Sequence, residues 1–120
     1  MKTRTILVGL MLALAGLGLI FLGCGGNAKT APYVVGGIFS ISGPASYLGE
    51  PERNSLEMVA AAINAQGGIN GHPLKLVIYD DEGDVTKARL HATKLAQDKD
   101  CLAVIGPSLT HTSMTTLEIT

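Results

Sequence analysis

Hydroxyl side chains gather near the end of this 120-residue chain, just after the short apolar run at residues 102–105. The set comprises Ser108, Thr110, Thr112, Ser113, Thr115 and Thr116. Unpaired N–H groups at a helix start, the positive end of the helix dipole and a hydroxyl together can hold an anion. No Lys or Arg lies between residues 100 and 120, so the pattern favours a small carboxylate ligand. Helix capping and contact with solvent remain the alternative for these hydroxyls.

Nucleotide chemistry is disfavoured by the loop after the first apolar run, which reads Ser42-Gly43-Pro44 rather than G-x-G-x-x-G. The chain also has no G-x-x-x-x-G-K-[ST] motif. Asp80, at the end of the second apolar run, is expected to cap a loop rather than bind a ribose. Ser113 or Thr110 as a nucleophile would need a base that the sequence does not identify. We therefore expect a binding protein without a cofactor, not an enzyme.

Metal binding is disfavoured by the spacing of the acidic and histidine side chains. The acidic group does not fit the calcium pattern D-x-[DN]-x-[DN]-G, and no cysteine or glutamate stands at ligand spacing from a histidine. These residues are Asp80, Asp81, Glu82, Asp84, His72, His91 and His111. We expect no metal site and structural or solvated histidines.

The elements that would position the hydroxyl loop alternate between strands and helices. Residues 34–39, 74–79 and 102–105 are predicted to be strands, and residues 51–66 and about 84–98 to be helices. The apolar residues expected on the helices are Leu56, Val59, Ala60 and Ile63 on the first, and Ala88, Ala92, Leu95 and Ala96 on the second. Pro51 suits a first helical turn, Gly67-Gly68 a helix end and Asp84 a cap.

This order predicts an α/β fold with a parallel sheet covered by helices on both faces. In such sheets ligands bind beyond the carboxyl ends of the strands, where successive connections leave to opposite sides. If the first strand is central, the loops at residues 42–49 and 107–112 meet there.

The amino terminus predicts export. Lys2 and Arg4 precede an uncharged stretch at residues 5–22, which is typical of a secretory signal. Phe21-Leu22-Gly23-Cys24 resembles the bacterial lipobox, with Phe21 where leucine is usual, so we expect an acylated Cys24. Residues 1–23 would be the signal and 24–32 the lipidated cysteine with a flexible tether. A plain cleaved signal and an uncleaved membrane anchor stay open, because 18 residues span about 27 Å as a helix.

Charge and length narrow the remaining part of the chain. Without Lys2 and Arg4, seven basic and ten acidic side chains leave a net charge of −3, which disfavours nucleic acid. Cys101 precedes an apolar run and is expected to be a buried, inert thiol. Three strands would leave an open sheet edge, so we expect an amino-terminal fragment of a longer protein, with a complete product as the alternative.

Four motifs in fixed order then carry a family resemblance. They are VGGIFSISGP at residues 35–44, AINAQGGING at 62–71, YDD at 79–81 and VIGP at 104–107. Across residues 33–120 the chain closely resembles the leucine/isoleucine/valine-binding proteins of bacterial branched-chain amino-acid ABC transporters. The resemblance implies the first part of one lobe of a type I periplasmic-binding fold, which closes with a second lobe around an amino acid and delivers it to a permease.

The resemblance also implies site residues. Ser108, Leu109 and Thr110 match the loop that gives hydroxyl and backbone donors to the ligand carboxylate, with Thr110 at the family's carboxylate-binding serine. Leu48, preceded by Tyr47, stands where the family often has an aromatic wall.

Three further expectations complete this picture. Gly83 and Leu109 occupy the places of a disulfide found in some relatives, so that bridge is absent. The protein is expected outside the cytoplasm, in the periplasm or at the cell surface. A binder of amides or urea, and the sensor domain of a receptor, remain alternatives within the same fold.

Overall fold

A computed structural model describes residues 30–119, and the predicted signal with Cys24 lies outside them. The elements alternate as predicted, and their bounds are β1 Tyr33–Phe39, α2 Ser46–Ala65, β2 Leu74–Asp80, α3 Val85–Gln97, β3 Cys101–Ile105 and α4 Thr110–Thr116. Each strand is one residue longer than predicted, at its start or its end. The strands are parallel and lie in the order β2-β1-β3, so the central position of the first strand is confirmed.

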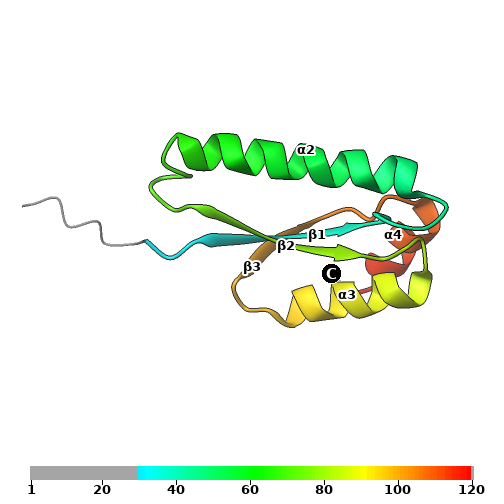
Figure 1. Ribbon diagram of the computed structural model, residues 1–120. Coiled ribbons are helices and arrows are strands. Elements are labelled where there is room, and N and C mark those ends of the chain that lie inside the picture. Colours follow the sequence, from blue (N-terminus) through cyan, green and yellow to red (C-terminus); the bar gives the residue numbers. More distant parts are fainter. Residues whose placement is uncertain (1–29, 120) are drawn as a thin grey trace, which may run out of the picture.

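The helices cover both faces of this sheet, with α2 on one face and α3 and α4 on the other (Figure 1). The connection from β1 to β2 through α2 and the connection from β2 to β3 through α3 therefore cross opposite faces of the sheet, and the predicted α/β class with helices on both faces is confirmed. All three loops that follow the strands lie at one end of the sheet, beside α4.

The core on the α3 face is built around Ile38 of β1. Ile38, Ala92 and Leu95 are buried together, as the helical spacing of the alanines and leucine predicted. Ala96 was predicted on this apolar side but is exposed, because it lies one residue beyond Leu95 and so turns about 100° away from the sheet.

The first helix begins five residues before the predicted start, at Ser46 rather than Pro51. Its first turn is closed by the N–H groups of Leu48 and Gly49, which donate to the carbonyl of Ala45 at 3.0 and 3.3 Å. Pro51 therefore lies inside the helix. Its fixed φ is compatible with helical backbone, but its missing N–H removes one backbone hydrogen bond and its ring crowds the preceding turn. A proline is an unsafe marker of a helix start when a second helical turn can form ahead of it.

The predicted helix ends and caps are otherwise confirmed. The Asp84 carboxylate caps α3 by accepting from the N–H groups of Thr86 and Lys87 at 2.8 and 2.9 Å. Helix α2 stops just before Gly67 and Gly68, whose φ angles of 96° and 79° lie in the left-handed region that favours glycine.

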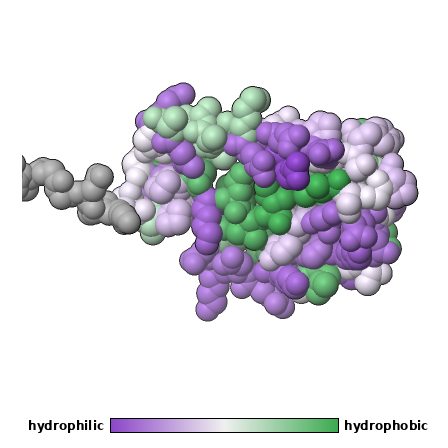
Figure 2. Space-filling view, in the orientation of Figure 1, coloured by the Kyte–Doolittle hydropathy of each residue, from purple (hydrophilic) through white to green (hydrophobic). Residues whose placement is uncertain are grey.

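Strand β3 pairs only with β1 among the described residues, so one of its edges is open. Leu102 and Ile105 are accordingly 64% and 44% exposed. Cys101, predicted to be buried, is only half-buried, because it begins this edge strand; it forms no disulfide. On the face shown in Figure 2, apolar residues form a band over the sheet between the polar surfaces of α2 and α3. In the described part of the chain, no helix has the length and apolar character needed to cross a membrane.

Candidate functional site

The carboxyl ends of β1 and β3 are joined by one serine side chain. The Ser108 hydroxyl, in the loop after β3, accepts a hydrogen bond from the N–H of Ser40, which directly follows β1, at 3.1 Å. The same hydroxyl donates to the Glu52 carboxylate on α2. The loop at residues 107–112 therefore contacts the residue that directly follows β1 and is tied to α2. A contact with the other predicted loop, residues 42–49, stays a prediction.

A buried polar pair extends this contact to β2. The Ser40 hydroxyl donates to Asp81 Oδ1 at 2.7 Å, and both residues are fully buried. The N–H of Gly83 donates to the same oxygen at 2.9 Å, whereas Oδ2 has no partner. Breaking such a buried contact leaves a charged group short of partners, which makes the arrangement of the loops costly to change.

Asp80 holds the loop after β1 from the opposite side. Its Oδ1 accepts from the N–H groups of Ile41, Ser42 and Glu82, and its Oδ2 accepts from the Ser42 hydroxyl at 2.6 Å. Burial alone would raise the pKa of the Asp80 carboxyl, but the Ser42 hydroxyl and the three N–H groups outweigh it and lower the pKa. The prediction that Asp80 caps a loop is confirmed.

Thr110 is the first residue of α4, and its side chain is exposed. It makes no side-chain hydrogen bond to another described residue. The hydroxyls of Thr112 and Thr115 instead donate to the carbonyls of Leu109 and His111 within the same segment. These hydroxyls therefore bond to the preceding turn without capping the helix, which has no side-chain cap, whereas the Thr110 hydroxyl makes no bond to the described residues.

The predicted wall residues lie on a helix rather than in a loop. Tyr47 and Leu48 belong to the first turn of α2, where Tyr47 is 73% exposed and Leu48 is half-buried. Gly49 brings this turn against β1, because a Cβ at Gly49 would lie 2.3 Å from the carbonyl oxygen of Ser40. A wall role for Leu48 or Tyr47 stays a prediction.

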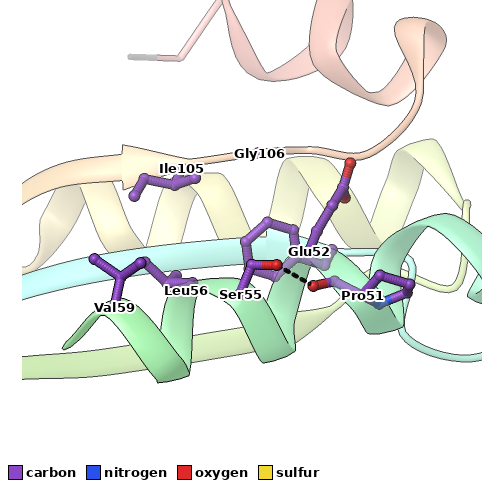
Figure 3. Close-up of a pocket in the computed structure, with 8 residues that line it drawn as sticks. Pro51, Glu52, Ser55, Leu56, Val59, Ile105 and Gly106 are labelled. Atoms are coloured by element: carbon purple, nitrogen blue, oxygen red, sulfur yellow. Dashed lines mark hydrogen bonds between the residues drawn. The ribbon is translucent and has the colours of Figure 1, made fainter. Parts of the chain in front are cut away.

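A groove of about 500 Å³ runs between α2 and β3, beside this edge. Its lining is mostly apolar, with Glu52 as the charged member: Phe39, Pro51, Glu52, Ser55, Leu56, Val59, Ile105 and Gly106. Figure 3 shows Glu52 reaching from α2 toward the loop after β3, while Ser55 bonds back to Pro51. The groove includes none of the five predicted ligand residues.

The loops after β2 and β3 also touch. A Cβ at Gly83 would lie 3.3 Å from the Leu109 side chain, and His111 Nε2 donates to the Gly83 carbonyl at 3.0 Å. The two positions that correspond to a disulfide in some relatives are thus adjacent, and here a glycine and a leucine occupy them. Within residues 30–119 no three His, Cys, Asp or Glu side chains gather as metal ligands would.

Sequence reasoning missed two residues that hold the site together. Ser40 carried one available signal, since it is a polar residue immediately after an apolar strand. Glu52 carried none, because its partner lies 56 positions away in the sequence.

The comparisons with known proteins agree with this geometry. The model of the periplasmic binding protein family matches residues 32–120. The chain is 37% identical over 98 residues to a Leu/Ile/Val/Thr-binding protein of Salmonella typhimurium, covering 82% of this chain and 24% of that protein. It is 34% identical over 80 residues to BasB, a chemotactic signal transduction substrate-binding protein of Halobacterium salinarum, covering 65% of this chain and 19% of that protein.

A solved structure of a substrate-binding protein also matches the fold of this chain. The branched-chain amino acid transporter substrate-binding protein LivJ of Streptococcus pneumoniae, in complex with isoleucine, superposes with a TM-score of 0.70 at 25% identity. The match covers 72% of this chain and 25% of LivJ, so the chain spans a quarter or less of each of these relatives. The chain therefore belongs to the periplasmic binding protein family, and within it resembles the Leu/Ile/Val-binding proteins.

Proposed function

We propose that this chain contributes to an extracytoplasmic substrate-binding lipoprotein of an ABC importer, which captures branched-chain or related amino acids and delivers them to a membrane permease. The observation that carries the ligand class is the 37% identity over 98 residues to a Leu/Ile/Val/Thr-binding protein, alongside the match of residues 32–120 to the periplasmic binding protein family. Binding without catalysis fits the solute-binding relatives. Export and anchoring rest on the signal pattern that ends in Cys24.

Within this function Thr110 donates its hydroxyl to the ligand carboxylate, supported by Ser108, Leu109 and, as a wall, Leu48 or Tyr47. Thr110 suits the role because its hydroxyl is exposed and makes no other hydrogen bond to the described residues. N–H groups in the first turn of a helix also lack intrahelical partners. Hydrogen-bond donors alone can then stabilise the charge of a ligand carboxylate, without a basic side chain.

Calorimetry on the product of the complete gene tests the ligand class. Branched-chain amino acids should bind, whereas short amides and urea should not. Thr110→Val should weaken amino-acid binding by about 1–3 kcal/mol, because a ligand oxygen would lose its donor. Thr115→Val is the matched control, since the Thr115 hydroxyl already donates to the His111 carbonyl. Unchanged affinity in Thr110→Val would refute the role of Thr110, and tight binding of carboxylate-free ligands alone would refute the carboxylate site.

A sensor function is the second candidate, because one relative is a chemotactic signal transduction substrate-binding protein. Lipid labelling addresses the anchor that both functions share: labelling of the wild type that disappears in Cys24→Ala supports it. Growth on a branched-chain amino acid that depends on the gene would support import. A gene-dependent chemotactic response without any uptake defect would support sensing.

A further inference from the structure

One acidic side chain outside the predicted site is hydrogen-bonded to the loop after β3. Glu52 lies on α2, and its carboxylate accepts the hydrogen bond that the Ser108 hydroxyl donates. Glu52 makes no ion pair with a basic side chain among the described residues. Among the described residues, the hydrogen bond from Ser108 is therefore the one polar contact of the Glu52 side chain.

The hydroxyl of Ser108 can donate one hydrogen bond, and it donates that bond to the Glu52 carboxylate. The same oxygen accepts from the Ser40 N–H at 3.1 Å. With donor and acceptor both in use, Ser108 can donate to a ligand only by giving up Glu52. Thr110, two residues later, keeps its hydroxyl free for that purpose.

The contact also belongs to a longer connection. Ser108 donates its hydroxyl hydrogen bond to Glu52 and accepts one from the N–H of Ser40. The Ser40 hydroxyl in turn donates to the buried carboxylate of Asp81. These hydrogen bonds join α2 to the ends of all three strands. A hydrogen bond to a charged acceptor is stronger than one between neutral groups, so the contact with the exposed Glu52 carboxylate contributes to the fixed geometry of the loop after β3.

We propose that Glu52 is a positioning residue for ligand binding: by accepting the hydrogen bond that the Ser108 hydroxyl donates, it fixes the loop at residues 106–110 and leaves Thr110 as the hydroxyl offered to the ligand. The inference rests on the proposed function, since it concerns the same site. It assigns Ser108 an indirect role, through the loop, in place of a direct contact with the ligand carboxylate.

The experiment uses the product of the complete gene and compares Glu52→Ala, Glu52→Gln and Ser108→Ala with the wild type. Glu57→Ala is the matched control, because Glu57 is an exposed carboxylate on the same helix without a hydrogen bond or ion pair to the described residues. Amino-acid affinity is measured by calorimetry. The amide exchange of Ser40, of Gly106 and of residues 108–110 is measured by hydrogen–deuterium exchange without ligand.

Glu52→Ala and Ser108→Ala should each weaken binding by about tenfold and speed exchange of the Ser40 amide by a similar factor, while exchange within α3 stays unchanged. Glu52→Gln keeps an acceptor oxygen and should stay within about threefold of the wild type in both measurements. Adding Ser108→Ala to Glu52→Ala should cost less than about twofold more, since both changes remove one interaction.

Two results would overturn the inference. If Ser108→Ala costs as much in the Glu52→Ala background as alone, Ser108 contacts the ligand directly. If Ser40 exchange in Glu52→Ala equals that of the wild type, Glu52 does not position the loop. Failure of the wild type to bind any amino acid would instead refute the proposed function, and the exchange measurement would still decide whether Glu52 fixes the loop.

Discussion

The sharpest stability prediction concerns Gly49, where α2 meets the end of β1. An alanine Cβ at this position would lie 2.3 Å from the carbonyl oxygen of Ser40, 2.4 Å from its carbonyl carbon and 2.7 Å from its nitrogen. All three atoms are backbone, so no flexible side chain can move aside. Ser40 itself is fully buried and held by hydrogen bonds to Ser108 and Asp81.

The magnitude follows from two opposing effects. Overpacking a well-packed site costs about 1–3 kcal/mol, and the rigid backbone here places Gly49→Ala at the upper end. Replacing a helical glycine by alanine returns about 1 kcal/mol through helix propensity. We therefore expect a net loss of about 2 kcal/mol and faster exchange of the Ser40 amide, since the loop after β1 must shift.

Ala61→Gly measures the propensity effect separately, because Ala61 is exposed on the same helix. It should destabilise by about 1 kcal/mol without changing exchange at Ser40. Chemical denaturation of both variants, in the product of the complete gene, gives the comparison. A Gly49→Ala variant as stable as the wild type, or more stable, would show that α2 does not pack this tightly on Ser40.

Three further predictions follow from the polar contacts of the loops. Asp84→Ala should lower the free energy of unfolding by about 1 kcal/mol in denaturant titrations, and Asp84→Asn by less, because only alanine loses the helix cap; equal losses would contradict this. The lowered pKa of Asp80 means that its stabilisation is fully present above its ordinary value of 3.8 and is lost as the pH falls through the lowered pKa. Melting temperatures of Asp80→Asn should thus depend less on pH below about 4 than those of the wild type, and parallel curves would refute the assignment. Ser40→Ala should cost about 1–3 kcal/mol in thermal melts, because Asp81 Oδ1 loses a donor while Oδ2 has no partner to compensate; no change in melting would show that the pair is dispensable.

Local signals in the sequence predicted most elements, for identifiable reasons. Asp84 before a helical pattern and Gly67-Gly68 after one each act through neighbouring backbone groups, so their effects can be read from a few residues. The start of α2 could not be read in this way. Pro51 is equally compatible with a first helical turn and with a position inside the helix. The outcome depended on the close packing of Gly49 against the backbone of Ser40, a tertiary contact that a local sequence pattern does not reveal.

The candidate site also has features that the sequence predicts and features that depend on tertiary contacts. Its location followed from sheet topology alone, because the order of strands and helices determines which loops meet at the carboxyl ends. The hydrogen bonds within the candidate site could not be predicted from the topology. The contacts of Glu52 with Ser108 and of Ser40 with Asp81 join residues 56 and 41 positions apart, and nothing in the composition of either segment marks them as partners.

The path of the chain into the sheet bears on how a tethered protein could use this site. The Thr30 hydroxyl donates to the Gly71 carbonyl, His72 Nδ1 donates to the Ala31 carbonyl at 2.8 Å, and the rings of Tyr33 and His72 stack at 4.5 Å. These contacts hold the entering chain at the amino ends of the strands. The seven residues of β1 then carry it about 23 Å to the loop that meets Ser108. An anchor at Cys24 would consequently pull on the end of the lobe farthest from Thr110, so attachment to a membrane and access of a ligand make demands on opposite ends of the same sheet (Figure 1).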